Sequence, residues 1–402
     1  MSQRYWSSLL WLLISVSSYL AHAQAKLPLL RATSSQVAIR DGGYLDKNAW
    51  TLSPKARPDV YTADRTREAK WVTFYTDLDS LRLRVKPGTR TNFIILLNGQ
   101  DSCYTQVASA ISLPPKARRR RTAVPDTIPF TLTADDVLAV QAVLNQQDTL
   151  LLHFDTGAFE VRLTREAILH KTHLLADQPA TLAGTAAPNY NRLRPSTSLQ
   201  LGTLTLRTPP VRATGLTARG MDGRFGYALF EGKQVAIDYD QHYLLVYSHL
   251  PRQAVRGYTK TKLLFRRSYM CVQAAFRVGD RGYPGEFLLD TGASAAVIVD
   301  SSWVSHQHFP QTLPLLQTVV LHNPQGEKME TRVVRAPAFS LGPYHLVEVP
   351  TNMLLRASPD RLAINNLGNE LLKRFNLVFD FQRDILYLKP NKLWGLPFRG
   401  HA

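Results

Sequence analysis

The sequence predicts a mainly β protein built from two related halves, with a small β-rich region before them. The tripeptide Asp-Thr-Gly occurs twice, at Asp155 and Asp290, each time directly after an apolar run typical of a strand. A second pattern follows each copy, at Gly226 and Gly368: an apolar residue and Gly, then Asp and an aromatic residue twelve positions after the Gly. Self-similarity on this scale indicates two halves of similar structure. Residues 81–86 alternate apolar and basic side chains, as a half-buried strand does.

The first 23 residues have the features of a secretory signal peptide. Arg4 supplies a positive charge, residues 9–20 are mostly apolar, and Ala21-His22-Ala23 offers small residues at the cleavage position. This apolar run is short for a membrane span, and nothing later in the sequence resembles one. We therefore expect an exported protein, periplasmic or extracellular, with no membrane span.

Residues 24–111 are expected to form a small β-rich N-terminal domain. Residues 71–75, 81–85 and 93–97 read as strands, and Pro-Gly and Asn-Gly pairs supply turns between such runs. Nothing in this region has a catalytic pattern. The sequence does not decide between a permanent domain and a propeptide.

Residues 112–127 are expected to be a basic, proline-containing linker. The run from Lys116 to Arg121 is the densest cluster of positive charge in a chain of net charge +17. Such a charge could attract nucleic acid, anionic lipid or polyanionic glycans. A proline-flanked basic run is more often a solvated linker and a place for proteolytic nicking, so we expect no nucleic acid partner.

Two cysteines, Cys103 and Cys271, are too few for a disulfide framework. They leave two alternatives open. One is a single bridge between the N-terminal region and the second half. The other is two unpaired, buried thiols.

The two halves are expected to span residues 128–250 and 257–392. The apolar fraction of 45% is ordinary for a globular protein, and the strand-like runs greatly outnumber the helical ones. The expected strands are 138–144, 149–154, 199–206, 270–277 and 286–290, and the expected helices are 164–175 and 369–375.

These residues resemble the pepsin-like and retropepsin-like aspartic peptidases, over about two-thirds of the chain. The resemblance rests on Asp155-Thr156-Gly157 and Asp290-Thr291-Gly292, together with the downstream Gly and Asp-aromatic patterns. It implies two β lobes, the double β-barrel of the acid protease fold, each contributing one aspartate. With both copies in one chain, the pair would form in a monomer, as in pepsin and unlike the retroviral enzymes. The upstream β-rich region resembles a segment that precedes such lobes in some exported bacterial proteins.

The chemistry explains why this reaction needs two facing carboxylates. Two carboxyl groups at hydrogen-bond distance cannot both ionise cheaply, so they share one proton over a wide pH range. The charged group acts as general base on a water, and the protonated group polarises the scissile carbonyl. The resemblance assigns the catalytic roles to Asp155 and Asp290. It also implies supporting residues around the pair: Thr156, Gly157, Thr291, Gly292, Ser294, Gly226 and Gly368.

Three residues depart from the family pattern. Phe159 stands where the family usually has Ser or Thr, whereas the second copy keeps Ser294. Arg224 and Asn366 stand where the family prefers apolar residues. These differences put the distribution of the proton, and therefore the pH optimum, in doubt, and they leave room for a lobe pair without turnover.

Other polar residues have simpler readings. Asp238 and Asp380 lie between strand runs and are expected to be turn carboxylates. Tyr190 is a candidate for a residue over the site. His153 is expected on the face of its strand opposite to Asp155. A metal site at the histidines is not expected, because His306 and His308 lack a nearby carboxylate.

The sequence therefore predicts an exported aspartic endopeptidase, acting on protein or peptide substrates without metal or organic cofactor. The main alternative is a catalytically degenerate peptide-binding protein of the cell envelope. A third possibility is an adhesin for anionic surface polymers, whose binding would collapse with added salt.

Overall fold

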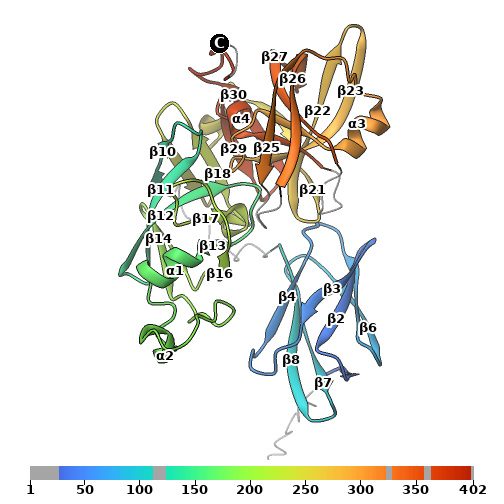
Figure 1. Cartoon of the computed structure of the whole chain (residues 1–402), viewed down its shortest axis with the longest axis vertical. Helices are drawn as coiled ribbons and strands as arrows, with labels where there is room; N and C mark the ends of the chain where they lie inside the picture. Colours follow the sequence, from blue (N-terminus) through green and yellow to red (C-terminus); the bar gives the residue numbers. More distant parts are fainter. Residues whose placement is uncertain (1–26, 112–123, 323–327, 357–363, 400–402) are drawn as a thin grey trace, which may run out of the picture. The chain divides into compact units, whose positions relative to one another are not determined.

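The computed structural model describes residues 27–111, 124–322, 328–356 and 364–399. The predicted signal peptide and most of the basic linker lie outside these residues. The fold is mainly β, with 52% strand and 9% helix, and its sheets form barrel and half-barrel arrangements (Figure 1). Contacts within the chain separate two compact units. The first contains the described residues up to Tyr61 with Thr73–Arg82 and Thr91–Val107, and the second contains Thr62–Val72, Leu83–Arg90 and the residues from Ala108 onward.

The N-terminal region has two four-stranded sheets. One has the order β1 (Leu29–Ala32), β7 (Arg90–Leu97), β8 (Asp101–Ser109) and β4 (Asp59–Ala63). The other has the order β3 (Tyr44–Thr51), β2 (Gln36–Asp41), β5 (Lys70–Tyr75) and β6 (Ser80–Val85). The strands predicted at 71–75, 81–85 and 93–97 are present as β5, β6 and β7. Phe74 and Phe93 are fully buried, with ring centroids 4.8 Å apart.

The first predicted half forms an eight-stranded sheet. Its order is β15 (Leu204–Arg207), β14 (Ser198–Leu201), β11 (Leu138–Leu144), β12 (Asp148–Asp155), β17 (Gly223–Gly226), β13 (Val161–Thr164) and β16 (Val211–Thr214), with β10 (Thr131–Leu132) paired to β11. Its helices are α1 (Arg165–Lys171), α2 (Pro179–Leu182) and the 3-10 helix η1 (Tyr227–Phe230).

Two predicted elements of this half have different bounds in the structure. The strand expected at 199–206 is a hairpin of β14 and β15, because Gly202, with φ +53°, turns the chain back. The helix expected at 164–175 is only α1. Thr164 caps its start, since the Thr164 hydroxyl accepts the N–H of Ala167.

The second predicted half also forms an eight-stranded sheet, which β22 and β26 close by an additional pairing. Its order is β21 (Leu264–Arg266), β22 (Tyr269–Val278), β23 (Arg281–Asp290), β28 (Asn365–Gly368), β24 (Val297–Val299), β27 (Tyr344–Leu354), β26 (Lys328–Leu341) and β25 (Leu315–His322). Its helices are α3 (Ser301–Gln307) and α4 (Asn369–Leu372). The predicted helix at 369–375 is thus shorter, and the long strands β25, β26 and β27 were not predicted.

Both halves place Asp-Thr-Gly in the same local topology. The strand that ends in Asp155 pairs in parallel with β17, which pairs antiparallel with β13 on its other side. In the second half, β23, β28 and β24 repeat this arrangement. A Cβ on Gly226 would lie 2.3 Å from the carbonyl oxygen of Ala158, and one on Gly368 would lie 2.0 Å from that of Ala295. Glycine therefore allows each Asp-Thr-Gly loop to pack directly on the strand that crosses beneath it.

The two halves share a six-stranded sheet. Its order is β20 (Thr259–Lys262), β30 (Ile385–Pro390), β29 (Phe375–Asp380), β18 (Gln234–Asp238), β19 (Tyr243–Tyr247) and β9 (Asp126–Pro129), and the 3-10 helix η2 (Arg252–Val255) follows β19. At its centre the repeated sequences pair with each other: Val235 lies opposite Phe379, and Ile237 opposite Leu377.

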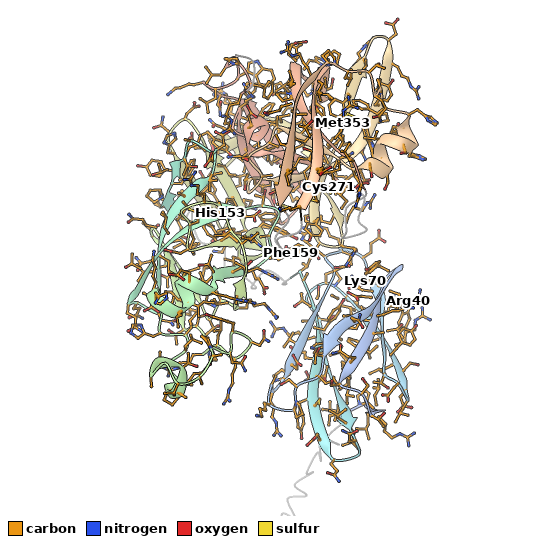
Figure 2. The ribbon with its side chains drawn as sticks, viewed as in Figure 1. Arg40, Lys70, His153, Phe159, Cys271 and Met353 are labelled. Carbon is orange, nitrogen blue, oxygen red and sulfur yellow. The ribbon has the colours of Figure 1, made fainter. Side chains whose placement is uncertain are left out.

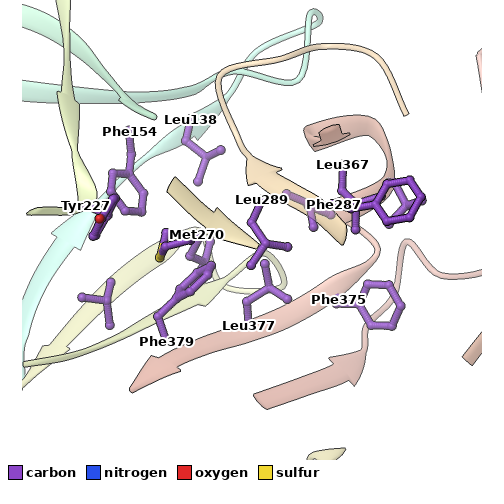
Figure 3. Close-up of a cluster of buried hydrophobic side chains, with 14 of the residues drawn as sticks. Leu138, Phe154, Tyr227, Met270, Phe287, Leu289, Leu367, Phe375, Leu377 and Phe379 are labelled. Carbon is purple, nitrogen blue, oxygen red and sulfur yellow. The ribbon is translucent and has the colours of Figure 1, made fainter. Parts of the chain in front are cut away.

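A large apolar core contains buried residues of both halves. Leu138, Phe154 and Tyr227 from the first half belong to the same buried cluster as Leu289 and Phe379 from the second (Figure 3). Because the apolar surfaces of both halves are removed from water together, the halves stabilise one another.

The cysteines are unpaired. Cys103 and Cys271 are both fully buried free thiols, so the alternative of a bridge between them is wrong. Cys271 is labelled in Figure 2. Burial raises its pKa to about 12, which makes this thiol a poor nucleophile. Among the described residues, no helix is long and apolar enough to cross a membrane.

Candidate active site

The two Asp-Thr-Gly loops have matching internal hydrogen bonds. The N–H of Gly157 donates to Oδ1 of Asp155 at 2.9 Å, and the N–H of Gly292 donates to Oδ1 of Asp290 at 3.1 Å. Asp155 is buried, with 8% of its surface exposed, and Asp290 is partly buried. Each carboxyl group is thus oriented by the turn of its own loop.

The loops bring the two carboxyl groups face to face. A Cβ on Gly292 would lie 2.7 Å from Cγ of Asp155, and a Cβ on Gly157 would lie 2.9 Å from Oδ1 of Asp290. Each carboxyl group therefore lies against the glycine of the opposite loop, in space that a methyl group would fill. Asp155 and Asp290, far apart in sequence, form one site.

Reciprocal hydrogen bonds between threonines hold the loops together. The N–H of Thr156 donates to Oγ1 of Thr291, and the N–H of Thr291 donates to Oγ1 of Thr156, both at 3.0 Å. The Thr156 hydroxyl donates to the carbonyl of Leu289 at 2.7 Å, and the Thr291 hydroxyl donates to that of Phe154 at 2.9 Å. Both threonines are almost completely buried, so these four bonds fix the loops with no competition from water.

The environment of the pair favours a shared proton. Burial first, and then the charge of Asp155 and a hydrogen bond with Asp155, together raise the pKa of Asp290 from its ordinary value of 3.8 to about 7. The N–H groups of Gly292 and Ala293 act in the opposite direction but are outweighed. Asp290 is therefore the protonated member near and below pH 7, and the titration belongs to the pair.

This pKa predicts how stability depends on pH. A group whose pKa is higher in the folded than in the unfolded protein binds its proton more tightly when folded. The stabilisation of the folded protein by Asp290 is therefore complete below pH 3.8, the pKa of an unfolded aspartate, and is lost as pH rises through about 7. Asp290→Asn cannot ionise, so at pH 8 its free energy of unfolding is expected to exceed that of the wild type by about 2–4 kcal/mol. It should therefore unfold at a higher temperature at pH 8, but not at pH 4. Thermal unfolding of both proteins at these pH values checks this, and an equal difference at both would contradict it.

Two further polar side chains contact the pair, one from each half. Nε of Arg224 lies 3.6 Å from Oδ2 of Asp155, and Nδ2 of Asn366 donates to Oδ2 of Asp290 at 3.1 Å. Both are among the three residues that depart from the pattern of the peptidases that the sequence resembles. The sequence marked them as unusual but gave no indication that each contacts the carboxyl group of its own half.

His153 is close to the site, contrary to the sequence-based expectation. Side chains two apart on a strand share a face, and both Asp155 and Arg224 act electrostatically on His153. Its Nε2 lies 3.0 Å from Oγ1 of Thr217, and its Nδ1 has no hydrogen-bond partner among the described residues. Burial lowers the pKa of His153 to about 4, so the imidazole is neutral near pH 7. The i, i+2 spacing could have revealed this placement.

The other predicted residues lie around the loops. Gly226 and Gly368 are directly beneath them, in register with Asp155 and Asp290. Ser294 is exposed, and its backbone carbonyl accepts a hydrogen bond from Arg399 at 2.9 Å. No pattern in the sequence indicates that Arg399 makes this hydrogen bond to the second loop.

The aromatic candidates Phe159 and Tyr190 pack against other side chains. The Phe159 ring lies 5.8 Å from that of Tyr227 and 4.9 Å from that of Tyr269, between centroids. Tyr190 is partly buried against the core, with the guanidinium of Arg165 5.4 Å above its ring. Phe159 thus supports its loop by packing where a hydroxyl would have offered a hydrogen bond.

Asp238 and Asp380 are turn carboxylates, as predicted. Asp238 accepts the N–H groups of residues 240 and 241, and Asp380 accepts those of residues 382 and 383, at 3.0–3.1 Å. Each caps the turn after a central strand, so neither belongs to the site. In the described part of the chain, no three His, Cys, Asp or Glu side chains are grouped as metal ligands.

Comparison of the sequence with protein-family models and with curated proteins gives no match.

Proposed function

We propose that this protein is an aspartic endopeptidase of the pepsin-like and retropepsin-like kind, with Asp155 and Asp290 as its catalytic pair. One observation carries the proposal: two Asp-Thr-Gly loops from repeated halves place each carboxyl group against the glycine of the other loop, with the threonines exchanging hydrogen bonds. Two turn aspartates without a joint role would not need this mutual arrangement.

The pair would hydrolyse a peptide bond by general acid–base catalysis. The charged carboxylate takes a proton from water while the water oxygen bonds to the scissile carbonyl carbon. The protonated carboxyl group gives its proton to the carbonyl oxygen. When the C–N bond breaks, the departing amine receives a proton, so the products are a carboxylic acid and an amine. Water is the nucleophile, and the reaction as written requires no cofactor.

The enzyme would be an exported monomer that acts on protein or peptide substrates. Both carboxylates come from one chain, so a monomer would be active. The apolar segment at residues 9–20 supports export to the periplasm or beyond. The substrate would be a protein or peptide that binds in extended form between the two halves.

A peptide-binding protein without turnover is the second candidate. The observation that favours it is the ion pair between Arg224 and Asp155, because a cation beside the general base weakens that base. In this case the site would hold a peptide that it does not cleave.

A peptide-library digest tests the proposal. Residues 24–402 are incubated with the library at pH 4 to 8 and the products are read by mass spectrometry, beside the double variant Asp155→Asn/Asp290→Asn as a control for contaminating peptidases. Cleavage by the wild type alone is expected, and it should decline as pH rises through about 7, where Asp290 loses its proton. Absence of cleavage throughout this range, with peptides still bound, would favour the second candidate.

A further inference from the structure

The two halves differ at a pair of equivalent positions whose side chains contact the carboxyl groups, Arg224 and Asn366. Arg224 lies two residues before Gly226 on β17, and Asn366 lies two residues before Gly368 on β28. Their strands pair in parallel with the strands that end in Asp155 and Asp290. The local geometry is therefore the same in both halves, while one half presents a cation and the other a neutral amide.

The guanidinium of Arg224 is buried beside the carboxyl group of Asp155. Only 10% of its side chain is exposed. Its Nη1 donates to the carbonyl of Leu216 at 3.4 Å, while its Nε makes no hydrogen bond to a described residue and lies 3.6 Å from Oδ2 of Asp155. A buried guanidinium is costly unless a negative charge is nearby. This arrangement therefore favours a negative charge on Asp155.

We propose that Arg224 and Asn366 assign distinct roles to the two aspartates, with Asp155 holding the negative charge as general base and Asp290 holding the proton as general acid. Arg224 and Asn366 are positioning residues in this account, since they act through the carboxyl groups. The inference rests on the proposed function. A full positive charge beside a carboxyl group favours its charged form, and a neutral amide does so less strongly.

Other charged groups near the pair do not supply this asymmetry. His153, on the same strand as Asp155, is neutral near pH 7 because burial lowers its pKa to about 4. Arg162, opposite Arg224 on β13, pairs with Glu160 at 3.1 Å and is about 40% exposed. Asp290 also faces Asp155 and carries the proton in this account. Arg224 is thus the cation that distinguishes the two halves.

The test is the pH profile of kcat/KM for a cleaved peptide in Arg224→Leu. Without the cation, the pair holds its protons more tightly, so both limbs of the profile are expected to move to higher pH by about one to three units. Arg224→Lys should restore much of the wild-type profile. Arg162→Leu, the matched control, removes the same charge from the neighbouring strand and should leave both limbs in place.

A direct titration separates this inference from the proposed function. Carboxyl ¹³C signals of aspartate are followed by NMR from pH 3 to 10 in the wild type, Arg224→Leu and Arg224→Lys, with assignment from Asp155→Asn and Asp290→Asn. A shift of the pair in Arg224→Leu without peptide cleavage in any variant would keep the assignment of charge and overturn the peptidase proposal. Cleavage with limbs and signals that do not move in Arg224→Leu would overturn this inference alone.

Discussion

Asp155→Asn and Asp290→Asn are each expected to lower kcat/KM for peptide cleavage by at least about 10²–10⁴-fold, the contribution of a positioned acid or base. Each carboxyl group has a step that the other cannot take over, since one must be charged while the other is protonated. Residues that act as a unit are not additive. The double variant should therefore lose little more than either single variant.

Folding must be monitored in the same proteins. An amide has nearly the same shape as a carboxyl group, and the Thr156–Thr291 bonds do not involve either carboxyl group. The near-ultraviolet circular dichroism of both variants should therefore match that of the wild type. Residual activity above about a tenth of the wild type in either variant would exclude the dyad mechanism. Asp238→Asn, a change at a turn carboxylate outside the site, serves as the control and should keep its activity.

The mainly β character and the repeat of two halves could be predicted because the sequence repeats its packing constraints. Gly226 and Gly368 are required where a strand crosses directly beneath a loop, and apolar runs are required where β18 and β29 pair at the centre of the shared sheet. Both constraints occur twice at similar spacing. Each constraint is carried by a few neighbouring residues, although the segments that they pack against are distant in sequence. One sequence is therefore enough to reveal them.

The long strands of the second half could not be predicted in the same way. In β25, Leu315 and Val320 are about half exposed, so burial does not impose a regular alternation there. β26 is long enough to pair with β25, β27 and β22. Its side chains face different neighbours along its length, which removes the period of two.

The candidate site was predictable in its residue types but not in its contacts. The repeat identified Asp155 and Asp290, whereas the asymmetry between them depends on how Arg224 and Asn366 pack after folding. A buried arginine beside a carboxylate has no signature in the sequence. The prediction for His153 was wrong because side chains two residues apart on a strand lie on the same face and not on opposite faces.

Gly292→Ala and Gly157→Ala are expected to abolish most activity while leaving the fold intact. The new methyl carbon at position 292 would lie 2.7–2.9 Å from the carboxyl atoms of Asp155, and that at position 157 would lie 2.9–3.0 Å from those of Asp290. Neither glycine has a left-handed φ, so alanine meets no backbone strain and the cost falls on the facing carboxyl group. That group is at the end of a side chain, so it can swing aside at a cost of about 1–3 kcal/mol.

Swinging one carboxyl group aside separates the pair. A misplacement of about 1 Å can cost on the order of 10² in rate, and loss of the shared proton should also lower the pKa of Asp290. We therefore expect a fall in kcat/KM of at least about 10²-fold, measured with the peptide used for the aspartate variants. Gly282→Ala, on β23 with open space around its Cα, is the matched control and should keep full activity. If both site variants stayed as active as this control, the facing of the two carboxyl groups would have no part in catalysis, because the methyl groups would occupy the space in which the carboxyl groups meet.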